Sequence, residues 1–177
     1  ELIDLYRGLG LTTIFVTHDQ EEALSLSDRI MLMNGGRIEQ AGSPEAIYAH
    51  PDTAFSSSFM GAANLVDATI REEDGTVLAE VAGAGRLALS PATAERGPVM
   101  LSLRQEDLIL SPVGEAAARP GLAGRVRARV FLGSRNRYLI EAGGAMLRVL
   151  APRDQRLHRD EAVLVGIAPE AVRLVRK

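Results

Sequence analysis

The stretch TTIFVTHDQEEALSLSDRIMLMNGGRIEQAGSPEAIYAHP, residues 12–51, decides how the first third of this chain is organised. It opens with a short run of β-branched and aromatic residues, Thr13 to Val16, that ends at Thr17-His18-Asp19. Such a run predicts a buried strand over Thr12–Val16. Open α/β folds present ligand-facing groups at the C-terminal ends of their strands, so His18 is the first candidate functional residue.

Capping and turn residues predict a helix and a hairpin after this strand. Asp19 can cap a helix that runs to about Ser27, and Glu22 is placed to complete a capping-box-like pair. Asn34-Gly35-Gly36 then separates two strand-like runs, 28–33 and 37–40. An Asn-Gly pair in that position is a strong signal for a β-hairpin.

Three further helical segments are expected before residue 62. Ser43 and Pro44 are the N-cap and the first residue of one helix. A last short helix starts at Asp52 and ends at Gly61. At the other end, the spacing of the leucines in Glu1–Leu9 is typical of the end of a helix that stops at Gly10.

Helical periodicity disappears after residue 64, and short strands separated by Gly and Pro take its place. Alternation of Val126, Ala128 and Val130 with arginines is typical of a strand with one buried face. Many short strands with turn signals between them predict a small barrel or sandwich. The expected strands are 65–71, 76–81, 86–89, 99–103, 124–132, 137–141, 146–150, 162–167 and 171–175.

Two segments of this β-rich region share a pattern that indicates internal duplication. They are LSLRQEDLIL at residues 101–110 and VGIAPEAVRLV at residues 165–175. Each has an apolar strand end, a short step with an acid, and then another apolar strand. Two partly interleaved copies of an OB-like five-strand unit would account for the pattern.

Charge changes along the chain where the helical pattern ends. Residues 1–64 hold 3 Arg against 9 Asp+Glu, a net charge of −6, and residues 65–177 hold 17 Lys+Arg against 14 Asp+Glu, a net charge of +3. We therefore expect a domain boundary near residue 62, with domains at 1–62 and 63–177. No apolar run approaches the ~20 residues that span a bilayer, no signal-peptide pattern is present, and the absence of cysteine excludes disulfides and thiolate metal ligands.

The block THDQEEAL, with the hairpin and Gly-Ser-Pro helix start that follow, resembles the switch-histidine region and the end of the catalytic domain of ABC-transporter ATPases. The rest resembles the TOBE-type OB-fold regulatory domain of bacterial solute importers. Residues 101–110 and 165–175 are similar to the LxxRPEDxxL edge of these domains, and Phe131-Leu132-Gly133 with Tyr138 to their FLGxxxxY motif. Gln105 and Ala168 depart from the usual edge sequence. The resemblance implies an α+β, mainly β chain: the remnant of an α/β ATPase core, then a duplicated OB-like β-barrel.

The same resemblance implies a role for His18, which in the family contacts the γ-phosphate of ATP and helps to position the attacking water. An imidazole can donate to a phosphate oxygen and accept from water, depending on its tautomer. The sequence contains no GxxxxGK[ST] phosphate loop, so ATP and Mg²⁺ are expected as cofactors only of an intact protein. This chain alone, with no cofactor-binding residue of its own, is expected to be inactive, as the C-terminal fragment of an importer ATPase.

The implied partners are a second ATPase subunit and transmembrane permease subunits, at the cytoplasmic face of the cell membrane. Removing most of an α/β core would leave apolar faces that need cover, which predicts a homodimer or an exchange of N-terminal elements. The resemblance implies a transported solute of the spermidine/putrescine, iron(III), phosphonate or sugar type, with polyamine or iron(III) favoured. The barrel is also a candidate site for a small-molecule regulator.

Other candidate residues have simpler explanations. Asp19, Glu21 and Glu22 are acids at a helix N-terminus, which the helix dipole favours. Gly35-Gly36 is a turn rather than a phosphate nest. His50 and His158 lack partners at ligand spacing, so no metal is assigned.

Two alternative functions remain for the chain as a whole. Residues 120–177 hold 12 Lys+Arg against 5 Asp+Glu, so the barrel could be a stand-alone module that binds a small anion. A nucleic-acid-binding OB protein is disfavoured, because stacking aromatics are few and the first third is acidic.

Overall fold

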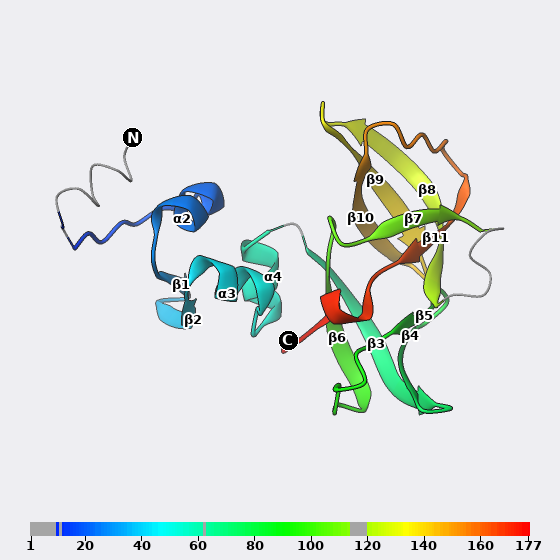
Figure 1. Cartoon of the computed structure of the whole chain (residues 1–177), viewed down its shortest axis with the longest axis horizontal. Helices are drawn as coiled ribbons and strands as arrows, with labels where there is room; N and C mark the ends of the chain where they lie inside the picture. The colour runs from blue at the N-terminus through cyan, green and yellow to red at the C-terminus, as the bar shows by residue number, and fades with distance from the viewer. Residues whose placement is uncertain (1–9, 11, 62, 114–119) are drawn as a thin grey trace. The chain divides into compact units, whose positions relative to one another are not determined.

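The computed structural model describes residues 10, 12–61, 63–113 and 120–177. These fall into two compact units, Glu1–Pro51 and Asp52–Lys177, which we describe separately (Figure 1). The helix end expected at Glu1–Leu9 lies outside the described residues. Within the described residues, no helix combines the length and the apolar character needed to cross a bilayer.

The first unit contains α2 (Gln20–Leu26), the hairpin β1 (Ile30–Asn34) and β2 (Arg37–Gly42), and α3 (Pro44–Ala49). Both helices begin where capping residues predict. The Asp19 carboxylate accepts from the backbone N–H groups of Glu21 and Glu22, and the Ser43 hydroxyl accepts from the N–H of Ala46. These side chains satisfy N–H groups that a helix start leaves unpaired.

The hairpin also forms as predicted. Gly35 and Gly36 have φ values of +55° and +78°, the left-handed conformation that a two-residue turn of this kind requires at both positions. The hairpin buries Ile30 and Leu32, and α3 buries Ile47. Successive residues of a strand point to opposite faces, so Met31, Met33 and Ile38 point away from Ile30 and Leu32 and are 58–60% exposed.

The prediction of a strand at Thr12–Val16 is wrong. These residues form no regular element, and Ile14 and Val16 are 86% and 91% exposed. A buried strand needs a neighbour that accepts its backbone hydrogen bonds, and no strand in the described part of the chain pairs with this segment. The apolar residues suit a buried strand, but the run itself does not show whether a partner strand is present.

The second unit begins with α4 (Ala54–Phe59), whose N-cap is Thr53. The division between units lies between Pro51 and Asp52, whereas the shift in charge placed a boundary at residue 62. Side chains explain the difference, because the Ser57 hydroxyl lies 2.5 Å from that of Ser102 on the β-rich domain. The segment before α4 also forms a parallel bridge, in which Ala54 N–H donates to the carbonyl of Arg176 at 2.7 Å.

Ten strands follow among the described residues of this unit. They join in one extended sheet in the order β10-β9-β8-β5-β4-β3-β6-β12, with β11 pairing β7 and β8. All nine expected strands are present, and the additional strand, β7, lies in the apolar end of the first repeat motif. Their bounds are β3 (Ala63–Glu73), β4 (Thr76–Val81), β5 (Gly85–Ala88), β6 (Gly97–Arg104), β7 (Ile109–Pro112), β8 (Gly121–Phe131), β9 (Arg135–Ala142), β10 (Ala145–Pro152), β11 (Ala162–Gly166) and β12 (Arg173–Val175), with a 3-10 turn at Pro169–Ala171.

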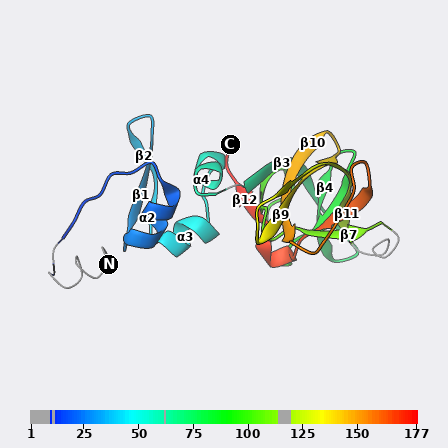
Figure 2. The same cartoon turned by 90° about the horizontal axis from the view of Figure 1, so that it is seen from above.

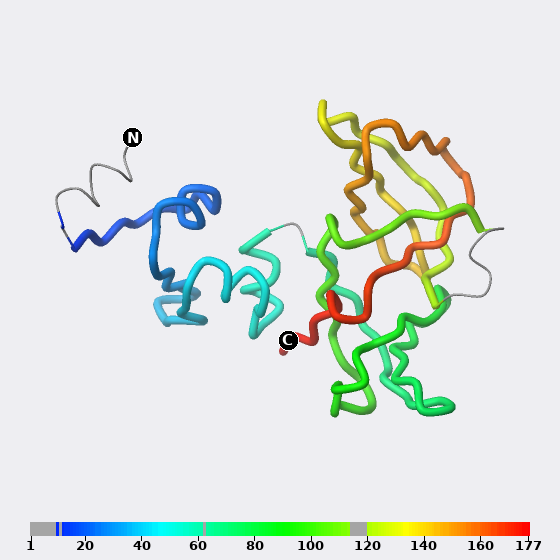
Figure 3. Tube along the Cα trace, in the orientation of Figure 1, coloured from blue at the N-terminus to red at the C-terminus, as the bar shows by residue number. Residues whose placement is uncertain are grey.

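The pairing of these strands confirms the duplication. The first repeat is β3–β7 and the second is β8–β12. In each, the first three strands form a meander and the fourth pairs with the first, β6 with β3 and β11 with β8. The fifth strands are exchanged: β7 pairs with β11 of the second repeat, and β12 with β6 of the first. In Figure 3 the tube of β7 runs beside that of β11, the strand of the second repeat with which it pairs.

The strands of this unit curve around a common interior (Figure 2). That interior holds one cluster of buried apolar side chains from both repeats, which includes Leu101, Leu122, Ile140 and Val165. At about 25 cal/mol per Å² of apolar surface, their burial is the main favourable term for this domain. The expected class, mainly β with a duplicated OB-like domain, is therefore confirmed.

A side chain rather than a strand ladder joins β10, at one end of the sheet path, to β3 in its interior. Asn64 on β3 donates to the carbonyl of Arg148 on β10 at 2.9 Å and accepts from the Arg148 N–H at 2.7 Å. It also donates to the carbonyl of Leu103 at 3.1 Å. An amide side chain carries the same donor and acceptor as a peptide group, so Asn64 substitutes for a backbone pair.

Candidate functional site

His18 lies on the surface, immediately before α2. It is exposed, and the residues on either side of it are fixed by hydrogen bonds. Asp19 N–H donates to the Thr17 hydroxyl at 2.9 Å, and that hydroxyl donates to the Glu22 carboxylate at 2.6 Å. These contacts fix a turn that presents the imidazole outward at the start of α2.

The acids around His18 stabilise the helix start. Asp19 uses its carboxylate as the N-cap, as expected for an acid at a helix N-terminus. Glu22 does not complete a capping box, because its carboxylate binds the Thr17 hydroxyl instead of the Asp19 N–H. Among the described residues, no group of three or more His, Asp or Glu is placed to hold a metal ion.

The two other histidines lie away from His18 in the chain and serve local structure through their backbones. His50 follows α3 as its C-cap and donates its N–H to the carbonyl of Ala46 at 2.9 Å. His158 donates its N–H to the Glu161 carboxylate at 2.8 Å. Both contacts are of the kind that ends a helix or shapes a loop.

The first repeat motif, Arg104-Gln105-Glu106-Asp107, anchors α4 to the sheet. Arg104 is only 6% exposed, and its guanidinium donates to the carbonyl of Met60 at the end of α4 at 3.2 Å. A cation at this position satisfies carbonyls that a helix end leaves unpaired. In the second repeat Ala168 stands at the matching position, so only one repeat has this anchor.

Asp107 lies beside this anchor. Burial raises the pKa of the Asp107 carboxyl above its usual value, and the charge of Glu106 adds to the effect. The charges of Arg104 and Arg173 act in the opposite direction. The site therefore holds a carboxylate that is harder to ionise than one in water.

The Phe131-Leu132-Gly133 motif forms the tip of the β8–β9 hairpin, where Gly133 has a φ of +82°. Phe131 is 62% exposed. Tyr138, the last residue of the same motif, is instead fully buried, and its hydroxyl donates to the carbonyl of Gln155 at 2.8 Å and accepts from the Leu157 N–H at 3.1 Å. The motif thus pairs an exposed apolar tip with a buried anchor for the 152–158 loop.

Asn136, also fully buried, is a second anchor for this loop that the sequence did not reveal. Its amide donates to the carbonyls of Pro152, Arg153 and Gln155 at 3.0–3.1 Å, and its oxygen accepts from Arg129 Nε at 3.0 Å. A lone Asn within an alternating strand carries no signal of its own. The one indication in the sequence is that Asn136 stands two residues before Tyr138, which places both side chains on the same face of β9.

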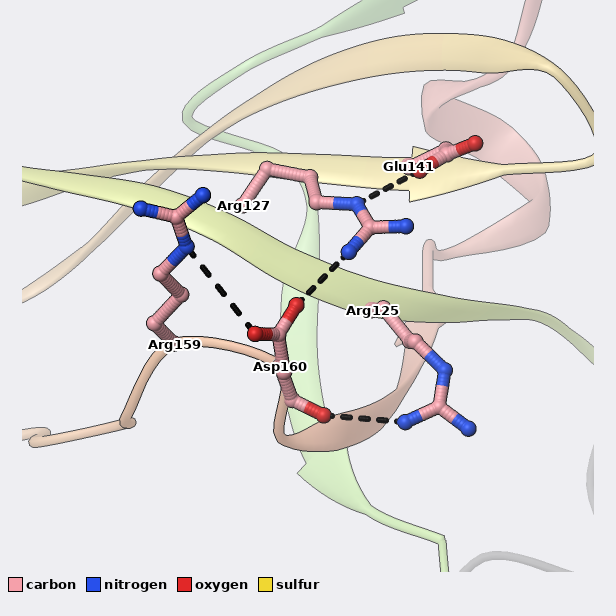
Figure 4. A network of polar contacts seen from close by, with 5 residues as sticks. All are labelled: Arg125, Arg127, Glu141, Arg159 and Asp160. Atoms are coloured by element: carbon pink, nitrogen blue, oxygen red, sulfur yellow. Dashed lines mark hydrogen bonds and ion pairs between the residues drawn. The ribbon is translucent and has the colours of Figure 1, made fainter.

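The arginines of β8 are held in a network with two acids (Figure 4). Arg127 contacts Glu141 at 2.5 Å and Asp160 at 2.6 Å. Arg125 donates to the backbone carbonyl of Asp160 at 3.0 Å, and Arg159 lies 3.9 Å from its carboxylate. The hydrogen bond and charge of Glu141, followed by those of Asp160, raise the pKa of Arg127. The Arg127 guanidinium is therefore already paired with Glu141 and Asp160 within the chain.

A shallow depression of about 360 Å³ lies over the first repeat. Its charged lining pairs internally, Arg71 with Glu80 at 3.5 Å and Arg86 with Glu73 at 2.5 Å. The remaining lining residues are Val81, Gly83, Ala84 and Gly85. With its charges already matched, the depression does not present a free charge to a ligand.

Comparison with known proteins connects these features to a family. Residues 101–175 match the model of the TOBE domain. The Spermidine/putrescine import ATP-binding protein PotA of Photobacterium profundum is 41% identical over 149 residues, which cover 82% of this chain and 40% of that protein. The protein of the same description from Pseudomonas aeruginosa (strain UCBPP-PA14) is 40% identical over 86% of this chain and 43% of its own length. The chain thus spans less than half the length of the curated relatives it matches.

A solved structure shares the fold at low sequence identity. The cytoplasmic molybdate-binding protein ModG, in a form with molybdate bound, superposes with a TM-score of 0.53 and 15% identity, covering 64% of this chain and 96% of the other. At this identity the likeness shows the fold alone.

The chain is therefore similar, over most of its length, to the C-terminal, TOBE-containing region of the ATP-binding subunits of ABC importers. Among such subunits, the relatives named above are spermidine/putrescine import proteins.

Proposed function

We propose that this chain acts as the C-terminal part of the ATP-binding subunit of an ABC importer and takes part in ATP-driven uptake of a polyamine. The observation that carries this is the 40–41% identity to spermidine/putrescine import ATP-binding proteins over 82–86% of the chain. The substrate class rests on those relatives alone. The described OB-like domain with its anchored helix would suit a subunit that couples nucleotide state to membrane partners.

His18 is the residue of this chain that we place at the nucleotide. Its imidazole is exposed at the start of α2, next to the partial positive charge of a helix N-terminus, which favours phosphate. ATP and Mg²⁺ would be held mainly by a phosphate loop, which this sequence does not contain. His18 would donate to the γ-phosphate or orient the attacking water, while the other parts supply charge neutralisation.

The partners in this proposal are a second ATP-binding subunit and the permease subunits, at the cytoplasmic face of the membrane. The barrel would bias the open or closed form of the ATPase pair. Such control is limited by the difference in binding free energy between the two forms.

The test of the proposed function is uptake of labelled putrescine and spermidine by cells whose gene carries His18→Ala. Loss of a group that orients water or binds the transferred phosphate typically costs ~10²-fold or more in turnover, so uptake should fall to near background. His158→Ala, which removes an exposed imidazole elsewhere, is the matched control and should transport normally. Normal uptake by the His18→Ala cells would contradict the role of His18, and absence of polyamine uptake in wild-type cells would contradict the substrate class.

An alternative function is a module that binds a small oxyanion. The fold shared with a molybdate-binding protein and the arginine cluster of β8 favour it, although Arg127 is already paired. Calorimetric titration with molybdate and sulfate would decide this alternative. Saturable binding that Arg125→Gln weakens would support it, and heat no greater than buffer dilution would remove it.

A further inference from the structure

The outer face of the second repeat, formed by β8, β9 and β10, carries arginines set among leucines. On the two outermost strands the register places Arg148 beside Leu139, and Leu150 beside Arg137. Arg125 lies on the same face of β8. Arg125 and Arg148 are exposed, and the other three side chains are half-buried. We call these five residues the basic face.

Within the described part of the chain, none of the three arginines of the basic face contacts a carboxylate. Arg125 donates to the main-chain carbonyl of Asp160 at 3.0 Å, as Figure 4 shows. Arg137 Nε is buried and has no hydrogen-bond partner. The two nearby acids, Glu141 and Asp160, both bind Arg127. The face therefore carries positive charge that its own acids do not neutralise.

Two of these cations lie close to each other. Arg137 stands opposite Leu150 and Arg148 two residues before it, so the two arginines are diagonal neighbours, typically about 7–8 Å apart. Like charges at such a distance repel each other, and the half-burial of Arg137 weakens the screening by water. This arrangement is unfavourable in the free chain, and an anionic partner would make it favourable.

The first repeat provides an internal control, because the same fold there has no excess of cations. Counting from the β4–β5 and β9–β10 turns and across the register, neutral residues stand where the three arginines do: Thr69, Thr76 and Ala88. The charged residues around them form ion pairs, Arg71 with Glu80 and Arg86 with Glu73. The fold therefore does not require arginines at these positions, and those of the second repeat need another reason.

We propose that the basic face binds an extended acidic segment of another protein. Arg125 stands opposite Glu141, which is four residues beyond Arg137 on β9, and four residues of strand span about 13 Å. An extended segment with carboxylates four residues apart covers the same span. Alternate residues of such a segment share one face, so an apolar side chain between two carboxylates would lie on Leu139.

Charge and composition favour this occupant over the others. A two-fold contact would set the basic face against itself and bring like charges together, so a second copy does not fit. Single-stranded nucleic acid is bound through stacking aromatics, and the basic face has none. A free oxyanion is too small to reach both ends of the face. The inference goes beyond the proposed function, since it requires neither nucleotide nor a transported solute.

Fluorescence anisotropy with a labelled synthetic peptide tests the proposal on the 177-residue chain. The probe is Glu-Ser-Leu-Ser-Glu-Ser-Leu-Ser-Glu, and the control peptide has Lys in place of each Glu. The acidic peptide should bind saturably, more weakly as salt is added, and the basic peptide should not bind. Arg137→Gln combined with Arg148→Gln should weaken binding roughly tenfold, the effect of losing two partly exposed ion pairs.

The matched control is Arg71→Gln combined with Arg86→Gln, which removes the same charge from the first repeat. This variant should bind the acidic peptide as wild type does. Equal weakening by both double variants would show an effect of net charge alone and overturn the proposal, as would the absence of saturable binding to wild type. Tighter binding of oligothymidylate or of phosphatidylglycerol vesicles than of the peptide would overturn the assignment to a polypeptide.

Urea denaturation of the free chain separates binding from folding. The Arg137→Gln and Arg148→Gln double variant removes a repulsion, whereas the first-repeat double variant breaks two ion pairs. The former should therefore unfold at a urea midpoint no lower than that of the latter. A lower midpoint would show that these arginines serve the fold, and the proposal would fail. These measurements use no nucleotide or membrane subunit, so their failure is distinguishable from failure of the uptake test on His18.

Discussion

At the scale of single residues, buried polar side chains fix the loops and seams of the β-rich unit. Tyr138, Asn136 and Asn64 each hold backbone groups that no strand ladder satisfies. None of them was identified as an anchor from the sequence, because a single buried amide or hydroxyl leaves no periodic pattern. His18 differs, since its neighbouring residues revealed it as a candidate through resemblance and not through any contact.

Tyr138→Phe tests how much the hydroxyl of this residue contributes. The change keeps the buried ring but leaves the Leu157 N–H and one contact of the Gln155 carbonyl unsatisfied. We expect the free energy of unfolding to fall by ~1–3 kcal/mol, measured by urea denaturation monitored by circular dichroism. A loss below the error of the fit would mean that water replaces both contacts without cost.

Asp107→Asn tests the raised pKa of this carboxyl. A group whose pKa is higher in the folded than in the unfolded state stabilises the fold below its ordinary pKa, and loses that contribution as pH rises through the folded value. At neutral pH the ionised carboxylate is therefore unfavourable. Asp107→Asn should be slightly more stable than wild type, by on the order of a few tenths of a kcal/mol after screening by water.

The pH dependence separates this effect from a change in packing. The advantage of Asp107→Asn should shrink as pH falls from the raised folded pKa toward the ordinary Asp value of 3.8 and should be absent below it, because the wild-type carboxyl is then neutral as well. Asp154→Asn, at an exposed position, is the control. An advantage that is the same at acidic and neutral pH would show that charge is not the cause.

At the scale of elements, local sequence determined most of what formed. Caps at Asp19 and Ser43 and the Gly35-Gly36 turn are interactions between near neighbours, and all three were predictable. The lack of a strand at Thr12–Val16 was not predictable, because strand pairing depends on a partner that is distant in the chain. The placement of α4 with the β-rich unit likewise depends on Ser102 and Arg104, more than 40 residues away.

Gly143→Ala tests a close approach between two turns. Gly143 packs against Ala82 and Ala84 in the β4–β5 turn, and an added methyl group would overlap with their backbone. Gly144 has a similar positive φ, but nothing lies within 4 Å of its added methyl. Both substitutions carry backbone strain, so the excess loss for Gly143→Ala, expected at ~1–3 kcal/mol, isolates the clash. Equal midpoints in urea would show that the β4–β5 turn can move aside.

At the scale of the whole molecule, repetition was the most informative signal in the sequence. Matching motifs at 101–110 and 165–175 predicted two interleaved five-strand units, and the exchanged strands β7 and β12 are their observed form. The sequence did not reveal the division between Pro51 and Asp52. That division reflects contacts of α4 with Ser102 and Arg104, which lie more than 40 residues further along the chain.

The exchange of fifth strands also affects how the protein is made. Because β6 pairs with β12, the first repeat is not complete until Arg173–Val175 has left the ribosome. Neither repeat can finish folding before the other is present, and the pairs that complete them join residues some 50 to 75 positions apart. Contacts of such long range slow folding, so the nascent first repeat has to remain soluble with an open sheet edge until the second repeat has been synthesised.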